Sequence, residues 1–185
     1  DYQYHTLGDS YYLFGMLKSI TDSSIGNSQT PTVTQKLEFN YVSQTDPNPA
    51  KPGNMLPVLN GLTTSSFNDA GGVTQQNHVR YGYDDKFRLT DVFVDLTPEE
   101  TTDSHEFHTG YTYKGDTKLI ETITESGRVQ VTVEYDSQDR VKTLRNDGQS
   151  VVTFEYNSGS TDVVDSFGNR TTFHYDSANF NRLTK

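Results

Sequence analysis

The feature that most constrains the fold is a short aromatic motif that recurs along the whole chain. An aromatic residue, any residue and then tyrosine occur together at residues 2–4, 39–41, 81–83, 111–113, 154–156 and 173–175, and residues 133–135 form a seventh copy with valine in the first place. The tyrosines that end the last four copies are 22, 21 and 19 residues apart, and the earlier copies are 30 to 42 residues apart. A fixed period near 20 residues indicates one supersecondary unit that is repeated, so the sequence predicts an array of such units.

Alternating hydrophobic residues predict that the motif lies on β-strands. In the stretch 127–135, Val129, Val131, Val133 and Tyr135 alternate with polar residues, and residues 32–42 alternate in the same way. Because side chains two apart on a strand point to one face, the two members of each copy are predicted to share a face. We expect rows of aromatic rings across neighbouring strands, each pair contributing about 0.2–1 kcal/mol.

A polar loop after the motif predicts how each unit turns. Residues 83–89 and 135–141 both read Tyr-Asp, three variable residues, Arg and an aliphatic residue, and residues 175–183 repeat this with two extra residues. An aspartate at this place can accept hydrogen bonds from backbone amides two residues on. Second strands are therefore predicted at 89–96, 141–145 and 161–164, and turns centred on Gly127, Gly148 and Gly168 join one hairpin to the next.

The predicted fold is all-β, with about a dozen strands in tandem hairpins that form a curved antiparallel ribbon and almost no helix. The chain is expected to be one continuous repeat segment, degenerate over 1–106 and regular over 107–185. Residues 43–61 hold four of the six prolines and are predicted to form an irregular insertion loop. A second, acidic insertion near 97–106 has Thr97, Pro98 and Glu100 at the spacing of a helix N-terminal capping box, which an acidic turn would explain equally well.

Composition excludes several classes of function. Only 31% of the residues are hydrophobic, which suits a thin sheet better than a thick core. A net charge of −10 disfavours binding to nucleic acid, because a phosphate backbone would be repelled. The chain has no cysteine, so disulfides and thiolate sites are excluded. No apolar run reaches the roughly 18 residues of a membrane-spanning helix.

Candidate chemistry in the sequence is sparse. His105 and His108, with Asp103 and Glu106, are either a weak metal site or, as we expect, part of a solvated loop. Glu134 and Glu155 stand at equivalent positions of adjacent repeats, which would suit a glycosidase pair but is better explained by a polar, wet face of the sheet. We therefore expect no catalytic residue, no metal and no cofactor. Asn169-Arg170-Thr171 fits a glycosylation sequon, although the needs of a turn explain it better.

With these stretches in view, residues 83–89, 135–141 and above all 165–183 resemble the YD repeats of the RHS family, whose core motif is close to G-x-x-x-R-Y-x-Y-D-x-x-G-R-L. The resemblance covers residues 107–185 well, 79–96 clearly and the first 60 loosely. The glycine of the family's Tyr-Asp-x-x-Gly-Arg loop is replaced in this chain by Phe87, by Asp139 and by Phe180-Asn181. The residues that carry the structural repeat motif are Tyr81, Tyr83, Asp84, Arg88, Tyr111, Tyr113, Tyr135, Asp136, Arg140, Gly148, Phe154, Tyr156, Gly168, Asn169, Phe173, Tyr175, Asp176 and Arg182.

The resemblance implies a structural and non-enzymatic role. Members of the family are mostly large bacterial polypeptides whose repeats coil into a hollow shell around a toxic domain, as in polymorphic RHS toxins and the B and C components of Tc-type insecticidal complexes. The implied partners are the rest of the same polypeptide, other shell chains and the enclosed toxin cargo, in a secreted or cell-surface complex. Asp46-Pro47 does not match the family's Asp-Pro-x-Gly protease element, so no protease function is carried over.

Two expectations stay open at this point. Because one copy of the motif begins at residue 2 and residue 185 soon follows another, the chain is expected to be a fragment of a longer array. The alternative to a shell segment is a cell-surface or secreted module that binds carbohydrate or protein, since exposed tyrosine rings can stack on sugar faces.

Overall fold

The fold is an all-β sheet whose strands pair in the order in which they occur along the chain. The computed structural model describes residues 1–6, 13, 15–24, 32–46, 48, 50–97, 105–147, 150–176 and 182–184. The strands are β1 (Tyr2–Tyr4), β2 (Leu17–Ser24), β3 (Thr32–Thr45), β4 (Met55–Phe67), β5 (Val73–Tyr83), β6 (Leu89–Asp95), β7 (Glu106–Tyr113), β8 (Ile120–Glu125), β9 (Arg128–Tyr135), β10 (Val141–Asn146), β11 (Ser150–Asn157), β12 (Ser160–Val164), β13 (Arg170–Asp176) and β14 (Arg182–Leu183). Their hydrogen-bonded order is β1 to β14, and no α-helix lies in these ranges, so the predicted all-β class is confirmed.

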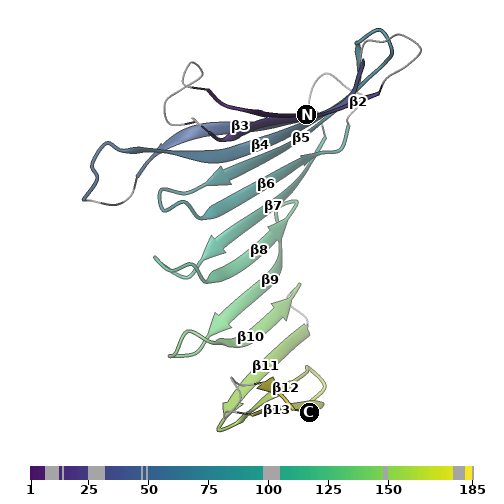
Figure 1. Ribbon diagram of the computed structural model, residues 1–185. Coiled ribbons are helices and arrows are strands. Elements are labelled where there is room, and N and C mark those ends of the chain that lie inside the picture. Colours follow the sequence, from purple (N-terminus) through teal and green to yellow (C-terminus); the bar gives the residue numbers. More distant parts are fainter. Residues whose placement is uncertain are drawn as a thin grey trace. The chain divides into compact units, whose positions relative to one another are not determined.

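The chain divides into two compact units, residues 1–108 and 109–185. The first contains β1 to β6 and the beginning of β7, and the second contains the rest of β7 and β8 to β14 (Figure 1). Among the described residues, the buried hydrophobic side chains are Leu13 and Val58 in the first unit and Val133 in the second. Each unit is therefore held by its strand pairing and by polar contacts more than by an apolar core, as the low hydrophobic content predicted.

The seven copies of the aromatic motif occupy every second strand. They lie on β1, β3, β5, β7, β9, β11 and β13, so one unit of the repeat is a pair of strands. Paired strands are about 4.8 Å apart, which places consecutive copies about 10 Å apart with a different strand between them. The predicted rows of directly stacked rings were therefore wrong. The ring pairs found among the described residues are instead His5 with Tyr41 and Phe93 with His108.

The prediction of an irregular loop over residues 43–61 was also wrong for most of its length. Strand β3 continues to Thr45 and β4 begins at Met55, and the two pair up to Thr45 opposite Met55. Pro57 is accommodated because β4 pairs with β5 only from Gly61 onward, so at Pro57 it is an edge, where a missing N–H is tolerated. The capping box predicted at residues 97–100 lies mostly outside the described residues.

A β-bulge recurs at the same place in five hairpins. In each, the tyrosine that ends the motif faces a residue of the next strand, and the residue after that one is skipped before pairing resumes. The residue that faces the tyrosine is the first paired residue of its strand in four of the hairpins, whereas in the β3–β4 hairpin pairing continues beyond Tyr41 to Thr45. The skipped residues are Lys18, Asn60, Thr90, Glu121 and Lys142. Because a bulge increases the local right-handed twist, each of these units bends its strand pair at its tyrosine end.

Candidate functional site

Aspartate side chains organise the loops that follow the motif. Asp84 Oδ1 accepts hydrogen bonds from the amides of Lys86 at 2.9 Å and Arg88 at 3.0 Å, and Arg88 Nε donates to Asp84 Oδ2 at 2.6 Å. Asp136 makes the same three contacts, with the amides of Gln138 and Arg140 at 2.8 and 2.9 Å and with Arg140 Nε at 2.7 Å. The predicted role of the aspartate in the turn is thus realised in both loops.

The same turn occurs at two further places, which connect one hairpin to the next. Asp165 accepts from the amides of Phe167 and Asn169 at 2.9 and 2.8 Å and from Asn169 Nδ2 at 2.7 Å. Asn68 accepts from the amides of Ala70 and Gly72 at 3.1 and 2.8 Å. Gly168 was predicted to centre a separate kind of connecting turn, and it is instead the fourth residue of this shared five-residue turn.

The fourth residue of the turn always has a left-handed backbone. The φ angle is +79° at Gly71, +61° at Phe87, +59° at Asp139 and +84° at Gly168. Glycine adopts this conformation without steric cost, whereas other residues are strained there. The hydrogen bonds to the aspartate and arginine therefore hold Phe87 and Asp139 in a conformation that their own side chains disfavour.

The hydrogen bonds of the turn also shift the acidity of its aspartates. Burial alone would raise the pKa of Asp84, but hydrogen bonds from the amide and side chain of Arg88 and from the amide of Lys86 lower it below its usual value. The Arg140 amide is the main cause that lowers the pKa of Asp136, and the Asn169 side chain is the main cause for Asp165. All three carboxylates are thus held in their charged form, which the turn requires.

Within residues 109–185, two loop cations lie over the tyrosine of the following repeat. The Arg140 guanidinium lies 4.1 Å from the centre of the Tyr156 ring, and the hydroxyl of Tyr156 donates to the carbonyl of Val141 at 2.8 Å. One repeat earlier, Lys114 Nζ lies 5.6 Å from the centre of the Tyr135 ring, and the Tyr135 hydroxyl donates to Ile120 O at 2.6 Å.

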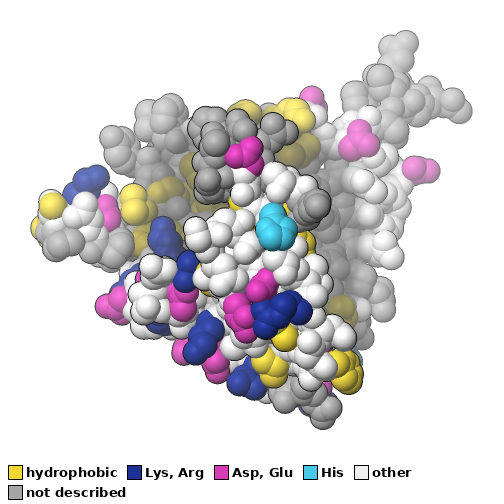
Figure 2. All heavy atoms as spheres, turned by 90° about the horizontal axis from the view of Figure 1, so that it is seen from below, with side chains coloured by type: hydrophobic (Ala, Val, Ile, Leu, Met, Phe, Trp, Pro, Cys, Tyr) yellow, Lys and Arg dark blue, Asp and Glu magenta, His cyan; other side chains and the backbone are white. Residues whose placement is uncertain are grey.

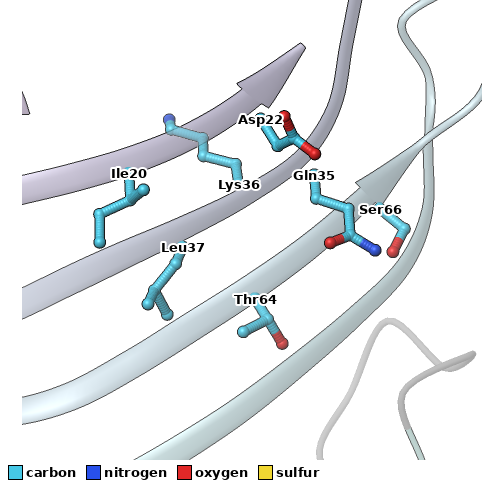
Figure 3. A pocket seen from close by; sticks show the side chains of 7 residues that line it. All are labelled: Ile20, Asp22, Gln35, Lys36, Leu37, Thr64 and Ser66. Carbon is cyan, nitrogen blue, oxygen red and sulfur yellow. The ribbon is translucent and has the colours of Figure 1, made fainter. Parts of the chain in front are cut away.

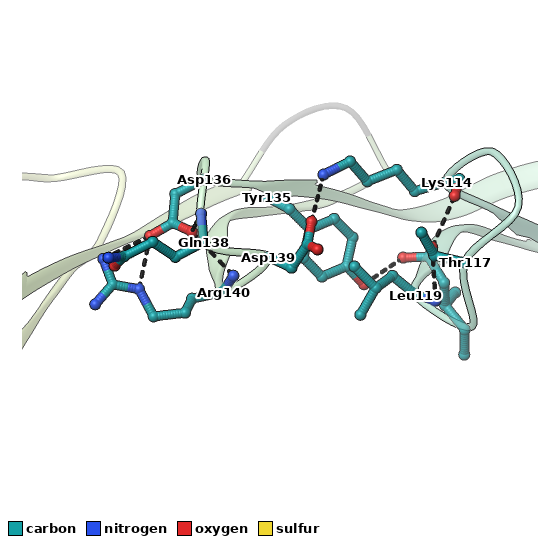
Figure 4. Close-up of polar contacts among 9 residues, drawn as sticks. Lys114, Thr117, Leu119, Tyr135, Asp136, Gln138, Asp139 and Arg140 are labelled. Atoms are coloured by element: carbon teal, nitrogen blue, oxygen red, sulfur yellow. Dashed lines mark hydrogen bonds and ion pairs between the residues drawn. The ribbon is translucent and has the colours of Figure 1, made fainter.

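Figure 4 shows how the earlier of these contacts continues into the next loop. Lys114 Nζ is also 2.7 Å from Asp139 Oδ1, an acidic residue of the following turn. Cations within about 6 Å of a ring centre are attracted to its face. Cation, ring and hydroxyl together therefore tie each of these repeats to the one before it, and we call this arrangement the cation–tyrosine link.

The motif residues predicted from the sequence fall into two groups. The first group lies in the turns and links: Asp84, Arg88, Asp136, Arg140, Gly168 and Asn169 in the turns, and Arg140, Tyr135 and Tyr156 in the links. The second group comprises the other described motif residues, which lie on their strands. Gly148 and the side chain of Arg182 lie outside the described residues. Asn68 and Lys114 were missed, because neither matches the Tyr-Asp pattern; the signal that could have found Asn68 is the Asn-x-x-Gly spacing at 68–71.

The face that carries Glu134 and Glu155 is built of cross-strand polar contacts. Arg170 Nη1 bridges Glu155 at 2.6 Å and Asp162 at 2.7 Å, while Glu134 accepts from Thr143 Oγ1 at 2.8 Å. On the face drawn in Figure 2, basic and acidic side chains lie next to one another. The two glutamates thus have separate partners, which lie on β10 for Glu134 and on β13 for Glu155.

The histidine cluster in the first unit is a stacked arrangement. The ring of His108 stacks on Phe93 with centroids 4.3 Å apart, and His108 Nε2 is 2.8 Å from Asp91 Oδ1. Gly82, opposite Asp91, leaves room for this carboxylate, since a Cβ there would lie 3.0 Å from Asp91 Oδ2. Within the described ranges, which omit Asp103, no group of three acidic or histidine side chains is placed to hold a metal ion.

A hollow of about 310 Å³ lies on the sheet of the first unit, over β2, β3 and β4 (Figure 3). Ile20, Leu37 and Thr64 are cross-strand neighbours that form one row of its lining, and Asp22, Gln35 and Ser66 form a second row. Lys36 also lines it and pairs with Glu38 at 2.7 Å. The lining therefore offers one carboxylate, one ammonium, one amide and two hydroxyl groups beside two aliphatic side chains.

Comparisons with known proteins add a weak structural similarity. No family model and no curated protein matches the chain. The crystal structure of TcdB2-TccC3-Cdc42 is similar over 99% of this chain and 15% of that chain, with 12% identity and a TM-score of 0.24. The crystal structure of TcdB2-TccC3-TEV is similar over 93% of this chain and 13% of that one, with 14% identity and a TM-score of 0.24.

A third similar structure is a Photorhabdus luminescens Tc holotoxin pore with a mutation in TccC3, with 14% identity and a TM-score of 0.24 over 99% of this chain and 13% of that one. This chain thus spans about one seventh of the chains it is similar to. The architecture described above rests on the chain's own strand pairing. Among the residues that the structure describes, no helix is long and apolar enough to cross a membrane.

Proposed function

We propose that the chain is a non-enzymatic structural segment of an RHS/YD-repeat array, whose strands form part of the wall of a shell around a toxin or effector domain. Its partners are then further repeats of the same polypeptide or other shell chains, together with the enclosed cargo, in a secreted or cell-surface complex.

The observation that carries this proposal is the repeated two-strand unit. The aromatic motif falls on every second strand, and the Asp-anchored turn recurs with nearly the same hydrogen-bond lengths. In the cation–tyrosine links, the contacts of one repeat are completed by the next. Such a unit gains its stability from its neighbours, as in other repeat proteins, and so supports a role as wall material.

The thin core supports the same role. Large hydrophobic side chains stay exposed, among them Phe167 at 90% and Leu96 at 58%. A sheet with so few buried apolar residues is expected to be covered or extended by other parts of an assembly. The ion pairs on the second unit's polar face suit a wall in contact with water.

The test is the structure and cargo of the natural polypeptide that contains these residues. We expect electron microscopy to place residues 1–185 in the wall of a closed shell, and limited proteolysis to spare a second domain inside it until the shell is opened. A native protein of about 20.8 kDa that is monomeric and unfolds cooperatively would overturn the proposal. The alternative, a module that binds carbohydrate or protein at a cell surface, would then be tested by glycan binding.

A further inference from the structure

One hairpin of the second unit lacks the loop that its two predecessors have. Strands β11 and β12 are joined by the two-residue turn Ser158-Gly159, whereas β9 and β10 are joined by the five-residue turn Asp136–Arg140. The β11–β12 pairing also has no bulge, since Tyr156 faces Thr161 and Glu155 faces Asp162 in unbroken register. Asn157 stands where Asp136 stands in the preceding hairpin.

Tyr175, the motif tyrosine that follows this hairpin, lacks the cation–tyrosine link among the described residues. Tyr135 and Tyr156 each have a loop cation on the ring and a hydroxyl bond to a carbonyl of the hairpin before them. Tyr175 is the next tyrosine in this series, and Thr161 is the residue whose carbonyl corresponds to Val141. Among the described residues, neither a cation contact to the Tyr175 ring nor a hydrogen bond from its hydroxyl is present.

A hollow of about 380 Å³ lies beside the Tyr175 ring, where the two preceding tyrosines have their loop cation. It is lined by Arg140, Tyr156, Asn157, Gly159, Ser160, Thr161 and Tyr175. This volume lies within the range of about 300–1,000 Å³ that is usual for ligand sites. On the face that carries Tyr156 and Tyr175, the lining offers two half-buried tyrosine rings and the hydroxyl group of Thr161.

We propose that this hollow is a docking site for an arginine side chain carried by a basic segment of a partner. The guanidinium would stack on Tyr175 and donate a hydrogen bond to the side chain of Thr161, which lies on the same face of the sheet as Tyr156 and Tyr175. It would take the place that Arg140 takes on Tyr156 and Lys114 on Tyr135, so the chain itself shows twice which chemistry fills this position.

Charge supports the same occupant. The chain carries a net charge of −10, which attracts a basic segment. The charge of Arg140 in the lining is balanced by Asp136, which holds its guanidinium through Nε and Nη2, both at 2.7 Å. Arg170 beyond the hollow is likewise bridged to Glu155 and Asp162. Because the nearby arginines are paired with carboxylates, an incoming guanidinium is not repelled locally, and the net negative charge of the chain attracts it.

The docking can be tested on the 185-residue chain, apart from any shell. The chain is labelled with ¹³C in its tyrosine rings, and NMR follows its titration with acetyl-Gly-Arg-Gly-amide and with the matched glutamate peptide. We expect the arginine peptide to shift the ring signals of Tyr175 and the glutamate peptide to leave them unchanged. Tyr4, an exposed tyrosine in the other unit, serves as the internal control. Equal shifts at Tyr4 and Tyr175 would overturn the proposal.

Three variants sharpen the test. Tyr175→Leu should weaken peptide binding at least fivefold, because it removes the ring face, whereas Tyr175→Phe should retain binding within about twofold. Replacing residues 157–160 by the sequence of the Asp136–Arg140 turn should abolish peptide binding, because the chain would then supply its own arginine. Retained binding in that loop variant would overturn the proposal, and so would a response of Tyr175 to maltotriose but not to the arginine peptide.

These outcomes are distinct from those that decide the proposed shell. Peptide binding at Tyr175 is read on the isolated chain, whereas the shell is read from the natural polypeptide. Each can therefore fail while the other holds.

Discussion

The Asp-anchored turn predicts a graded response to substitution at Asp84. Asp84→Ala removes the acceptor of two backbone amides and the partner of Arg88. The two backbone hydrogen bonds contribute about 1 kcal/mol each. The Arg88 pair, with side chains 15% and 19% exposed, contributes about 1 kcal/mol, the upper end of the range for surface pairs. We therefore expect the opening free energy of this hairpin to fall by about 3 kcal/mol.

Two further variants separate the parts of that sum. Asp84→Asn should cost only about 1 kcal/mol, because a carboxamide can still accept from both amides, as Asn68 does in its own turn. Asp85→Ala removes the same charge from the neighbouring, exposed position and should change the opening free energy by less than about 0.5 kcal/mol.

Hydrogen exchange followed by mass spectrometry on peptides from residues 79–95 gives the opening free energy of this hairpin directly, even where the two units unfold separately. A loss for Asp84→Asn as large as that for Asp84→Ala would refute the equivalence of the two turns. A loss for Asp85→Ala as large as that for Asp84→Ala would mean that charge, and not the turn, is responsible.

Three other predictions follow from the same contacts. Tyr156→Phe should destabilise the second unit by about 1 kcal/mol through loss of the bond to Val141, while Tyr175→Phe should be neutral, as measured by urea unfolding followed by circular dichroism. In the same assay Asp139→Gly should stabilise by about 0.5 kcal/mol, because relief of the left-handed backbone gains about 1 kcal/mol and loss of the exposed ion pair with Lys114 costs about 0.5 kcal/mol. Gln138→Gly should instead destabilise by about 0.5 kcal/mol, and equal signs for the two variants would contradict the strain argument. The pKa values of Asp84, Asp136 and Asp165 are lowered in the folded state. The stabilisation from these carboxylates is therefore present above the unfolded-state pKa of about 3.9 and is lost as pH falls through the folded-state pKa. Urea midpoints measured from pH 7 to pH 2 should drop below about pH 4, and the drop should be smaller in Asp84→Asn.

The strands were predictable because they depend on local patterns. Alternation placed the run that ends at Tyr135, and the Tyr-Asp-x-x-x-Arg spacing placed the turn that follows it, within a residue or two of where β9 ends and β10 begins. These signals concern residues that are close in sequence, and neither depends on which strand comes next to which. The repeat period then predicted that the hairpins follow one another.

What the sequence did not give depends on contacts between strands. The aromatic rings were expected in adjacent rows, but pairing inserts a second strand between successive copies, so Tyr156 meets Arg140 and a carbonyl in place of another ring. The prolines of residues 43–61 led us to expect a loop, yet Pro57 lies in β4. The pairing of β4 with β5 begins only at Gly61, so Pro57 lies at an edge, and no sequence pattern near residue 57 indicates where that pairing begins. The turns at Asn68 and Asp84 share a backbone conformation but not a sequence, because their fourth residue is Gly71 in one and Phe87 in the other. Their similarity could therefore not be predicted from the sequence.

The sequential order of the strands determines how such a chain is made. Each strand finds its partner in the segment synthesised just before or just after it, so pairing requires closure of short connections only. Local pairing of this kind favours fast folding. Repeats that contact only their neighbours can also fold progressively, as soon as each hairpin has left the ribosome. In such an architecture a further repeat adds its own strand pair without raising the kinetic barrier for the repeats that are already present.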